Sequence, residues 1–242
     1  MINFDYIKGR KFVDVQTSLA TKVKPRVLIP IATAQEANCD IIQKFMLAGA
    51  QVRTVLVEGE ISKKRLLQEL LDVKIVFFPD VHEEKLNLFY EIFSSMEIFG
   101  EVKALLNERD GLIWGYRNGF RLLEKLDLLP VGNMAIRVGA KQEETETSVR
   151  ITSNLSPWLM DCKVGESYIT KARKHAEFIA ENSKLEDLGR NGQIASQYTQ
   201  DNVTEWGIES LTSADGRIFG QIGKGEDTYL MKIIMSGLRY YL

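Results

Sequence analysis

The turn at residues 115–119, Gly-Tyr-Arg-Asn-Gly, constrains the fold of this chain more than any other feature. A short apolar run over 112–114 enters the turn, and a helical pattern over 120–126 follows it at once. A strand that passes into a helix through a glycine-flanked corner lifts one side chain, here Arg117, to the rim of a sheet. Hydrolases with this layout carry Ser or Cys there, and arginine cannot attack a carbonyl. An ordinary strand-turn-helix connection that uses Asn-Gly is an equal alternative on spacing alone.

The region before this turn alternates strand and helix patterns. The continuous apolar run 26–31 is typical of a strand that is buried on both faces. The pattern then predicts a helix over 36–48 that ends at Gly49, a strand over 52–57, a helix over 63–71 capped by Ser62, and a strand over 73–79. Such alternation predicts an α/β fold with a mostly parallel central sheet and helices on both faces.

The rest of the chain changes character after residue 133. A long helical stretch over 83–109, broken near Gly100, precedes the turn. Short strand patterns at 149–152, 193–198 and 217–222 are expected to extend the same sheet, and a terminal helix is expected over 228–241. We therefore expect a polar lead-in or linker over 1–25 and one domain over 26–242.

Composition excludes several classes of protein. Thirty-one basic and 33 acidic residues leave a net charge of -2, so no global field attracts nucleic acid or an anionic membrane. Two cysteines and two histidines show no metal-ligand spacing. The sequence contains no stretch of about 18 apolar residues, which is the length needed to span a bilayer. We expect a cytoplasmic protein without metal, cofactor, nucleic-acid partner or membrane partner.

Five segments carry more distinctive sequences. They are 26–30, 110–113 with 118–120, 153–159 (Ser-Asn-Leu-Ser-Pro-Trp-Leu) with 163–165, 191–195, and 212–220. In this order they resemble the glutamine amidotransferase domain of phosphoribosylformylglycinamidine synthase over roughly residues 25–240. The run 153–159 is specific, because a generic α/β sheet does not require it. The resemblance implies a flavodoxin-like, class I amidotransferase fold and the hydrolysis of glutamine to supply ammonia for purine biosynthesis.

The chain departs from that family at the positions that the resemblance marks as catalytic. Arg117 stands at the nucleophilic Cys, and Lys224 stands at the His that acts as base. Asp80 and Val81 replace the two glycines of the oxyanion turn, so only the orienting carboxylate, Glu226, is retained. Loss of a nucleophile or base costs on the order of 10⁶-fold in turnover, and loss of one oxyanion donor about 10²- to 10³-fold. The resemblance therefore predicts no useful glutaminase.

Three interpretations follow from these substitutions. The first is an inactive relative that keeps the fold and docks on a phosphoribosylformylglycinamidine synthetase subunit. The second is a sensor whose pocket binds a phosphorylated or carboxylate metabolite. The third is a different lysine-dependent chemistry, with Lys224 as base or Schiff-base lysine and Glu226 or Glu177 as its partner. Neither Cys39 nor Cys162 is assigned a catalytic role, and a family His-containing element is blurred at 174–178.

The same positions define the expected binding site. Its predicted residues are Arg117, Asn118, Gly119, Lys224, Asp80 and Val81. A cation at the N-terminus of a helix is disfavoured by the helix dipole, so Arg117 should have a negative partner. An internal pair with Glu226 is favoured over a bound anion held by Arg117 and Lys224.

Overall fold

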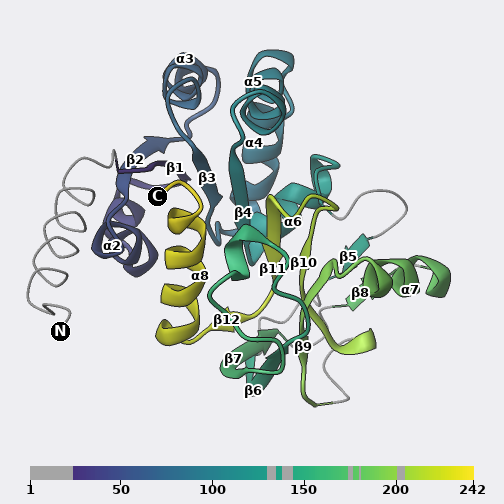
Figure 1. The fold of residues 1–242 in the computed structure, drawn as a ribbon. Helices are drawn as coiled ribbons and strands as arrows, with labels where there is room; N and C mark the ends of the chain where they lie inside the picture. The colour runs from purple at the N-terminus through teal and green to yellow at the C-terminus, as the bar shows by residue number, and fades with distance from the viewer. Residues whose placement is uncertain (1–23, 130–134, 138–143, 174–176, 180, 201–204) are drawn as a thin grey trace, which may run out of the picture.

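The computed structural model describes residues 24–129, 135–137, 144–173, 177–179, 181–200 and 205–242 (Figure 1). The predicted lead-in over 1–25 lies almost wholly outside these ranges, so the predicted boundary at residue 25 stays a prediction.

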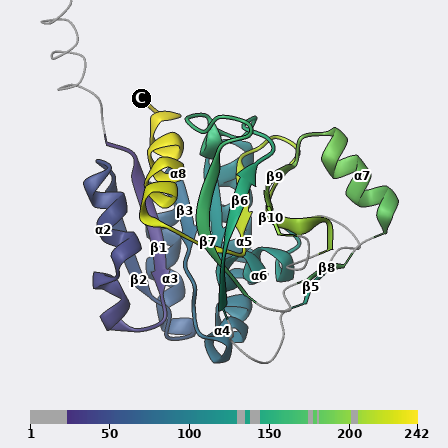
Figure 2. The ribbon, with the colours of Figure 1, turned by 90° about the horizontal axis from the view of Figure 1, so that it is seen from below.

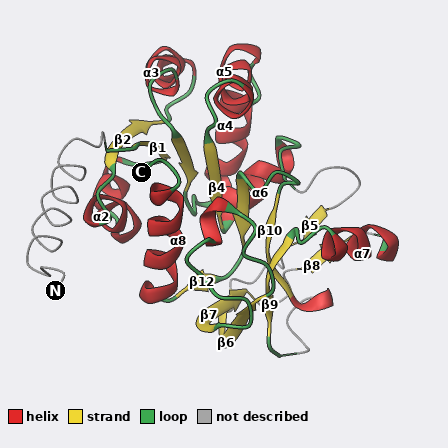
Figure 3. Cartoon of the chain, in the orientation of Figure 1, coloured by secondary structure: helices red, strands yellow, loops and turns green. Residues whose placement is uncertain are grey.

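One large sheet forms the centre of the molecule. Its strands are β1 (Arg26–Ile31), β2 (Gln51–Leu56), β3 (Ile75–Phe78), β4 (Leu112–Tyr116), β6 (Glu144–Ile151), β7 (Ser167–Arg173), β9 (Ile194–Tyr198), β10 (Ile208–Thr212), β11 (Ile218–Gln221) and β12 (Lys224–Gly225). They lie in the order β12-β7-β6-β9-β10-β11-β4-β3-β1-β2. The pair β5 (Ala135–Arg137) and β8 (Glu177–Ile179) forms a separate two-stranded sheet (Figure 3).

The predicted α/β fold class is confirmed. The strands β2, β1, β3, β4 and β11 pair in parallel, and the remaining strands extend the same sheet by antiparallel pairing. The short strand patterns expected at 149–152, 193–198 and 217–222 correspond to β6, β9 and β11, so they do join this sheet. Four of the five parallel strands lie in the part of the chain that alternates with helices, as crossover connections require. The fifth, β11, comes late in the chain and pairs with β4.

Helices cover both faces of the sheet. They are α2 (Asp40–Leu47), α3 (Glu60–Leu70), α4 (Glu83–Phe93), α5 (Met96–Asn107), α6 (Asn118–Lys125), α7 (Asn182–Arg190) and α8 (Asp227–Arg239). Short 3-10 turns occur at Ala34–Asn38, Pro157–Leu159 and Glu205–Gly207. Apolar side chains of α3 to α7 share one core cluster, whereas those of α2 and α8 share a second. Helices α2 and α7 lie at opposite ends of the molecule (Figure 2).

The antiparallel half of the sheet curls. Four strands separate β11 from β12 in the sheet, yet only residues 222–223 connect them in the chain. Three virtual bonds span at most about 11 Å, whereas five strand spacings in a flat sheet would span about 24 Å. Strands β12, β7, β6, β9, β10 and β11 must therefore bend round so that the first lies beside the end of the last.

Three predicted helix boundaries were wrong. The helix expected over 36–48 is interrupted at Cys39, whose backbone is extended. The break expected near Gly100 lies instead at Ser94 and Ser95, whose hydroxyls donate to carbonyls of the preceding turn and compete with helix continuation. Ser62 is not the N-cap of α3. The helix begins after Gly59, and the Ser62 hydroxyl donates to the Gly59 carbonyl at 2.6 Å.

A pair of glycine substitutions tests how tightly the sheet and α6 are packed. A Cβ on Gly119 would lie 2.0 Å from the carbonyl oxygen of Phe78 on β3, whereas a Cβ on Gly100 in α5 would meet no atom within 4 Å. We expect Gly119→Ala to lower the free energy of unfolding by about 2 kcal/mol or more, and Gly100→Ala to raise it by about 0.5–1 kcal/mol. Urea unfolding measures both. Equal stability of the two variants would contradict this packing.

Candidate functional site

The strand-to-helix corner predicted at 115–119 is present. Arg117 lies between β4 and α6 with φ 56° and ψ -109°, a region that costs energy for any residue with a side chain. Both flanking glycines are needed for close approach. A Cβ on Gly115 would lie 2.5 Å from Leu123 Cδ1, and Gly119 packs against the β3 carbonyl described above. The corner is therefore a strained elbow that positions a single side chain.

Two carboxylates hold the Arg117 side chain, which is only 7% exposed. Its Nε donates to Asp80 Oδ2 at 2.7 Å, and its Nη2 donates to Glu144 Oε1 at 2.6 Å. Burial alone would lower the pKa of Arg117, but these two carboxylates outweigh burial and raise that pKa. The guanidinium is therefore permanently charged and fixed in place.

The predicted pair between Arg117 and Glu226 was wrong. Glu226 is the exposed residue that precedes α8. Asp80 is the partner because β3 and β4 are parallel neighbours in which Phe78 pairs with Gly115. Asp80 then follows β3 at the level at which Arg117 follows β4. A negative partner was correctly expected, but strand register selected which one.

Asp80 also accepts a hydrogen bond from the backbone of the elbow. The N–H of Asn118 donates to Asp80 Oδ1 at 3.2 Å. In elbows that carry a nucleophile, the N–H after the nucleophile points at the developing oxyanion. The Asn118 side chain donates to the Val81 carbonyl at 2.6 Å and ties the same loop down. Asp80 and Val81 are thus both hydrogen-bonded to Asn118, the residue after Arg117.

A cavity of about 440 Å³ opens beside the elbow. Arg117 and Lys224 are the cationic residues of its lining, and the acidic ones are Glu36, Asp40, Asp80, Glu144 and Asp227. Asp40 and Asp227 are both bound by the buried Lys44. Burial alone would lower the pKa of Lys44, but its bonds to these carboxylates raise it. Acidic groups therefore outnumber basic ones around this cavity.

The predicted site residues fall into two groups. Arg117, Asp80 and Lys224 line the cavity. Asn118, Gly119 and Val81 are buried and take no part in its lining. Glu226 lines a separate hollow of about 250 Å³ on the other side of Lys224.

The remaining chemical candidates are dispersed. Cys39 is at the cavity wall, and Cys162 is buried, which raises its pKa to about 11. Within the described ranges, no cluster of His, Cys, Asp and Glu is arranged to hold a metal ion. Residues 174–176 lie outside the described part of the chain, and Glu177 begins β8.

Residues 24–233 match the CobB/CobQ-like glutamine amidotransferase domain family. The chain belongs to this family. The match covers the elbow, the cavity and all ten strands of the large sheet. It leaves out residues 1–23, the C-terminal end of α8 and the final residues. No curated protein matches the chain by sequence.

Three solved structures are similar to this amidotransferase domain. PurLQS from Thermotoga maritima matches with a TM-score of 0.66 and 18% identity over 90% of this chain and 99% of that one. The glutaminase domain of Trypanosoma brucei CTPS with bound acivicin gives 0.55 and 12%, over 90% and 92%. A glutamine amidotransferase from Thermotoga maritima gives 0.52 and 15%, over 83% and 76%. At these identities the likeness shows the fold alone.

Two acidic residues of this region were not predicted from the sequence. Glu144 precedes the strand expected over 149–152, but it begins β6. Glu209 lies on β10, a strand that was not predicted, and is fully buried. Ser196 donates to Glu209 Oε2 at 2.5 Å, and the Gly223 N–H donates to Oε1 at 3.1 Å. Burial raises the pKa of Glu209 to about 7, even though these donors lower it. An Ile-Glu-Ser-Leu run gives no signal that its glutamate faces inward.

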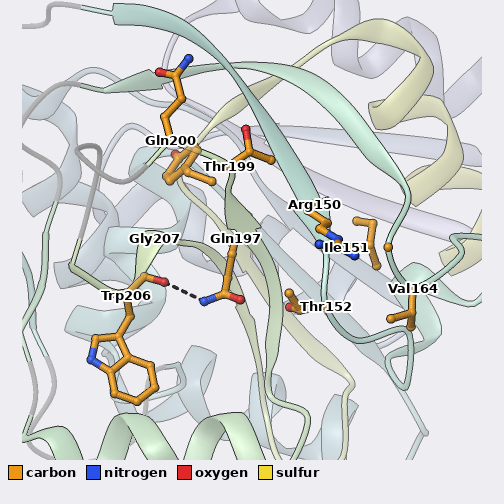
Figure 4. A pocket seen from close by; sticks show the side chains of 11 residues that line it. Arg150, Ile151, Thr152, Val164, Gln197, Thr199, Gln200, Trp206 and Gly207 are labelled. Atoms are coloured by element: carbon orange, nitrogen blue, oxygen red, sulfur yellow. Dashed lines mark hydrogen bonds between the residues drawn. The ribbon is translucent and has the colours of Figure 1, made fainter.

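A larger cavity, of about 690 Å³, lies away from the elbow (Figure 4). Gln197 lines it and donates to the Trp206 carbonyl at 2.7 Å. Arg150 is the only residue with a full charge among the described residues of its lining. None of the predicted site residues is among those that line it.

The ion pairs of Arg117 predict a stability effect. Asp80→Asn leaves a buried guanidinium with one carboxylate, and we expect it to lower the free energy of unfolding by about 1–3 kcal/mol. The lower part of this range allows for the 32% exposure of the Asp80 side chain. Glu83→Gln breaks the more exposed pair with Arg121 and should cost under about 1 kcal/mol. Chemical denaturation measures both variants, and equal losses would contradict a special role for Asp80.

Glu209 predicts how stability depends on pH. A carboxyl whose pKa is raised in the folded state binds its proton more tightly there than in the unfolded chain. The contribution of Glu209 to the free energy of unfolding is therefore fully present below the ordinary pKa of 4.5. This contribution is lost as the pH rises to about 7. Relative to Glu209→Gln, which cannot titrate, the parent protein should lose about 3 kcal/mol across this window in choline chloride buffer. Parallel pH profiles of the two proteins would show that Glu209 titrates normally.

Proposed function

We propose that this protein is a non-hydrolysing glutamine amidotransferase domain that acts as a structural partner of a phosphoribosylformylglycinamidine synthetase. The observation that carries the proposal is the position of Asp80. Its carboxylate binds both the Arg117 guanidinium and the Asn118 N–H at the elbow. The group that should stabilise an oxyanion is thereby satisfied within the protein itself.

The chemistry of glutamine hydrolysis explains why this arrangement is unproductive. The reaction needs a nucleophile at the elbow, a base beside it and donors for the oxyanion. A guanidinium has only donors and does not lose its proton in proteins. An oxyanion that formed near Asn118 would meet the carboxylate of Asp80, which repels it. Lys224 stands at the position of the base, and it is exposed to solvent.

The partner is proposed from two observations. The five sequence segments resemble the amidotransferase domain of phosphoribosylformylglycinamidine synthase, and the PurLQS chain is covered almost completely by this fold. No helix within the described ranges is long and apolar enough to cross a membrane. The proposed role is in purine biosynthesis, and the proposed location is the cytoplasm.

The two alternative functions have weaker support. An anion sensor could use Arg117 Nη1, which is buried without a hydrogen-bond partner among the described groups. The five acidic residues of the cavity lining outnumber Arg117 and Lys224, however, and would repel an anion. For a lysine-dependent reaction, Glu226 shares the 250 Å³ hollow with Lys224, but Lys224 is exposed to solvent.

The proposed function predicts that the purified protein releases no ammonia from glutamine, either alone or mixed with a synthetase that lacks its own amidotransferase domain. Coupled measurement of ammonia gives the rate. Sustained release that survives alkylation of Cys39 and Cys162 would show that the assignment of the elbow is wrong.

Docking is tested separately by co-elution of the same two proteins in size-exclusion chromatography. A stable complex supports the structural role. Two separate peaks, at concentrations at which an intact amidotransferase binds the synthetase, would exclude it.

Acivicin provides a chemical control for the elbow. It should modify an Arg117→Cys, Asp80→Gly double variant at residue 117 and leave the parent elbow unmodified.

A further inference from the structure

Three oxygen atoms converge inside the curled half of the sheet, in front of Gly223. This residue belongs to the two-residue connection between β11 and β12. A methyl group built on its Cα would lie 2.5 Å from Thr170 Oγ1, 2.6 Å from Glu209 Oε1 and 3.2 Å from Tyr198 Oη. The three oxygens come from β7, β10 and β9, so the curl itself brings them together.

Two of these oxygens are buried without partners. Thr170 is 1% exposed and Tyr198 is 7% exposed, yet neither hydroxyl forms a hydrogen bond with any described group. Burying a hydroxyl without a partner is unfavourable, so such atoms normally mark a bound water, ion or ligand. Glu209 Oε1 accepts the Gly223 N–H at 3.1 Å, and the side chains of Gln221 and Ser210 also act as donors that lower the pKa of Glu209. These donors are all neutral, so they leave the charge of the carboxylate unbalanced.

The charge around Glu209 is uncompensated. Among the described residues, no cation forms an ion pair with this carboxylate. Arg117 is near enough to affect the neighbouring Tyr198, but Asp80 and Glu144 already bind it, and the three groups together carry one negative charge. The other groups that face this region are Tyr116, Tyr198 and Tyr229. All three have raised pKa values because they are buried, so they are neutral.

We propose that Glu209, Thr170 and Tyr198 form a binding site for a monovalent cation of the size of K⁺ or NH₄⁺. The donors are all oxygens, which suit hard cations and ammonium. A single carboxylate balances a single charge, whereas divalent cations in proteins usually gather further carboxylates. The site is distinct from the elbow cavity, because none of its three residues lines that cavity.

Two of the three residues also line surface depressions. Tyr198 lines the 690 Å³ cavity, and Thr170 lines the 250 Å³ hollow beside Lys224. Their hydroxyl oxygens are themselves buried, so an ion enters the site only with a local movement of these side chains. The inference does not depend on the proposed function, since it rests only on the residues of the curl.

Thermal unfolding at constant ionic strength tests the proposal. Choline chloride is replaced stepwise by KCl, NH₄Cl or NaCl, at pH 8 and at pH 5. At pH 8 we expect a saturable rise in Tm with K⁺ or NH₄⁺, of about 3–6 °C at ten times the dissociation constant, and a smaller rise with Na⁺. The relative size of the KCl and NH₄Cl responses identifies the preferred ion. At pH 5 the rise should vanish, because Glu209 is then protonated.

Variants separate this site from general salt effects. Glu209→Gln and Thr170→Val should abolish the saturable rise, whereas Thr212→Val, an equally buried threonine on β10, should retain it. If Thr170→Val does not fold, Tyr198→Phe removes one ligand with little change in volume. Identical responses to K⁺, NH₄⁺ and choline, or a response that Glu209→Gln leaves intact, would overturn the proposal and leave water as the occupant.

Discussion

The ion pair between Arg117 and Asp80 is the interaction on which the chemistry of this domain depends. It joins the ends of two central parallel strands at a corner whose backbone is strained. Glu144 completes the arrangement from the antiparallel half of the sheet. A charge buried at the N-terminus of α6 is tolerated only because two carboxylates surround it. The elbow therefore carries a fixed electrostatic link between the two halves of the sheet.

The curled half of the sheet creates a second polar environment. The short connection between β11 and β12 forces six strands to bend, and their inner side carries buried polar groups such as Glu209, Ser196 and Thr170. Glu209 and Ser196 lie on the neighbouring strands β10 and β9, whereas two strands separate β10 from β7, which carries Thr170. Three strand spacings in a flat sheet would span about 14 Å, so curvature explains why the Thr170 hydroxyl lies close to the Glu209 carboxylate. This environment is also separate from the elbow cavity.

Local patterns predicted much of the fold because they act over a few residues. The apolar run at 26–31 and the glycines at 115 and 119 each report a constraint within one strand or one turn. Helix ends were less predictable: Ser94 and Ser95 break a helix through their own hydroxyl bonds, whereas Gly100 continues it in solvent. Strand β10 was missed because Glu209 interrupts its apolar pattern and is stabilised only by distant partners.

The sequence by itself determined the α/β alternation, the elbow and the arginine at its apex, because each depends on residue types at short spacing. Only the tertiary structure decided which carboxylate binds Arg117, since Asp80, Glu144 and Glu226 are equivalent as residue types. Strand register and curvature bring residues together across more than 20 positions, and no local pattern encodes the resulting distances. Electrostatic energy depends on those distances. The tertiary structure therefore determines how charges are balanced around Arg117 and around Glu209.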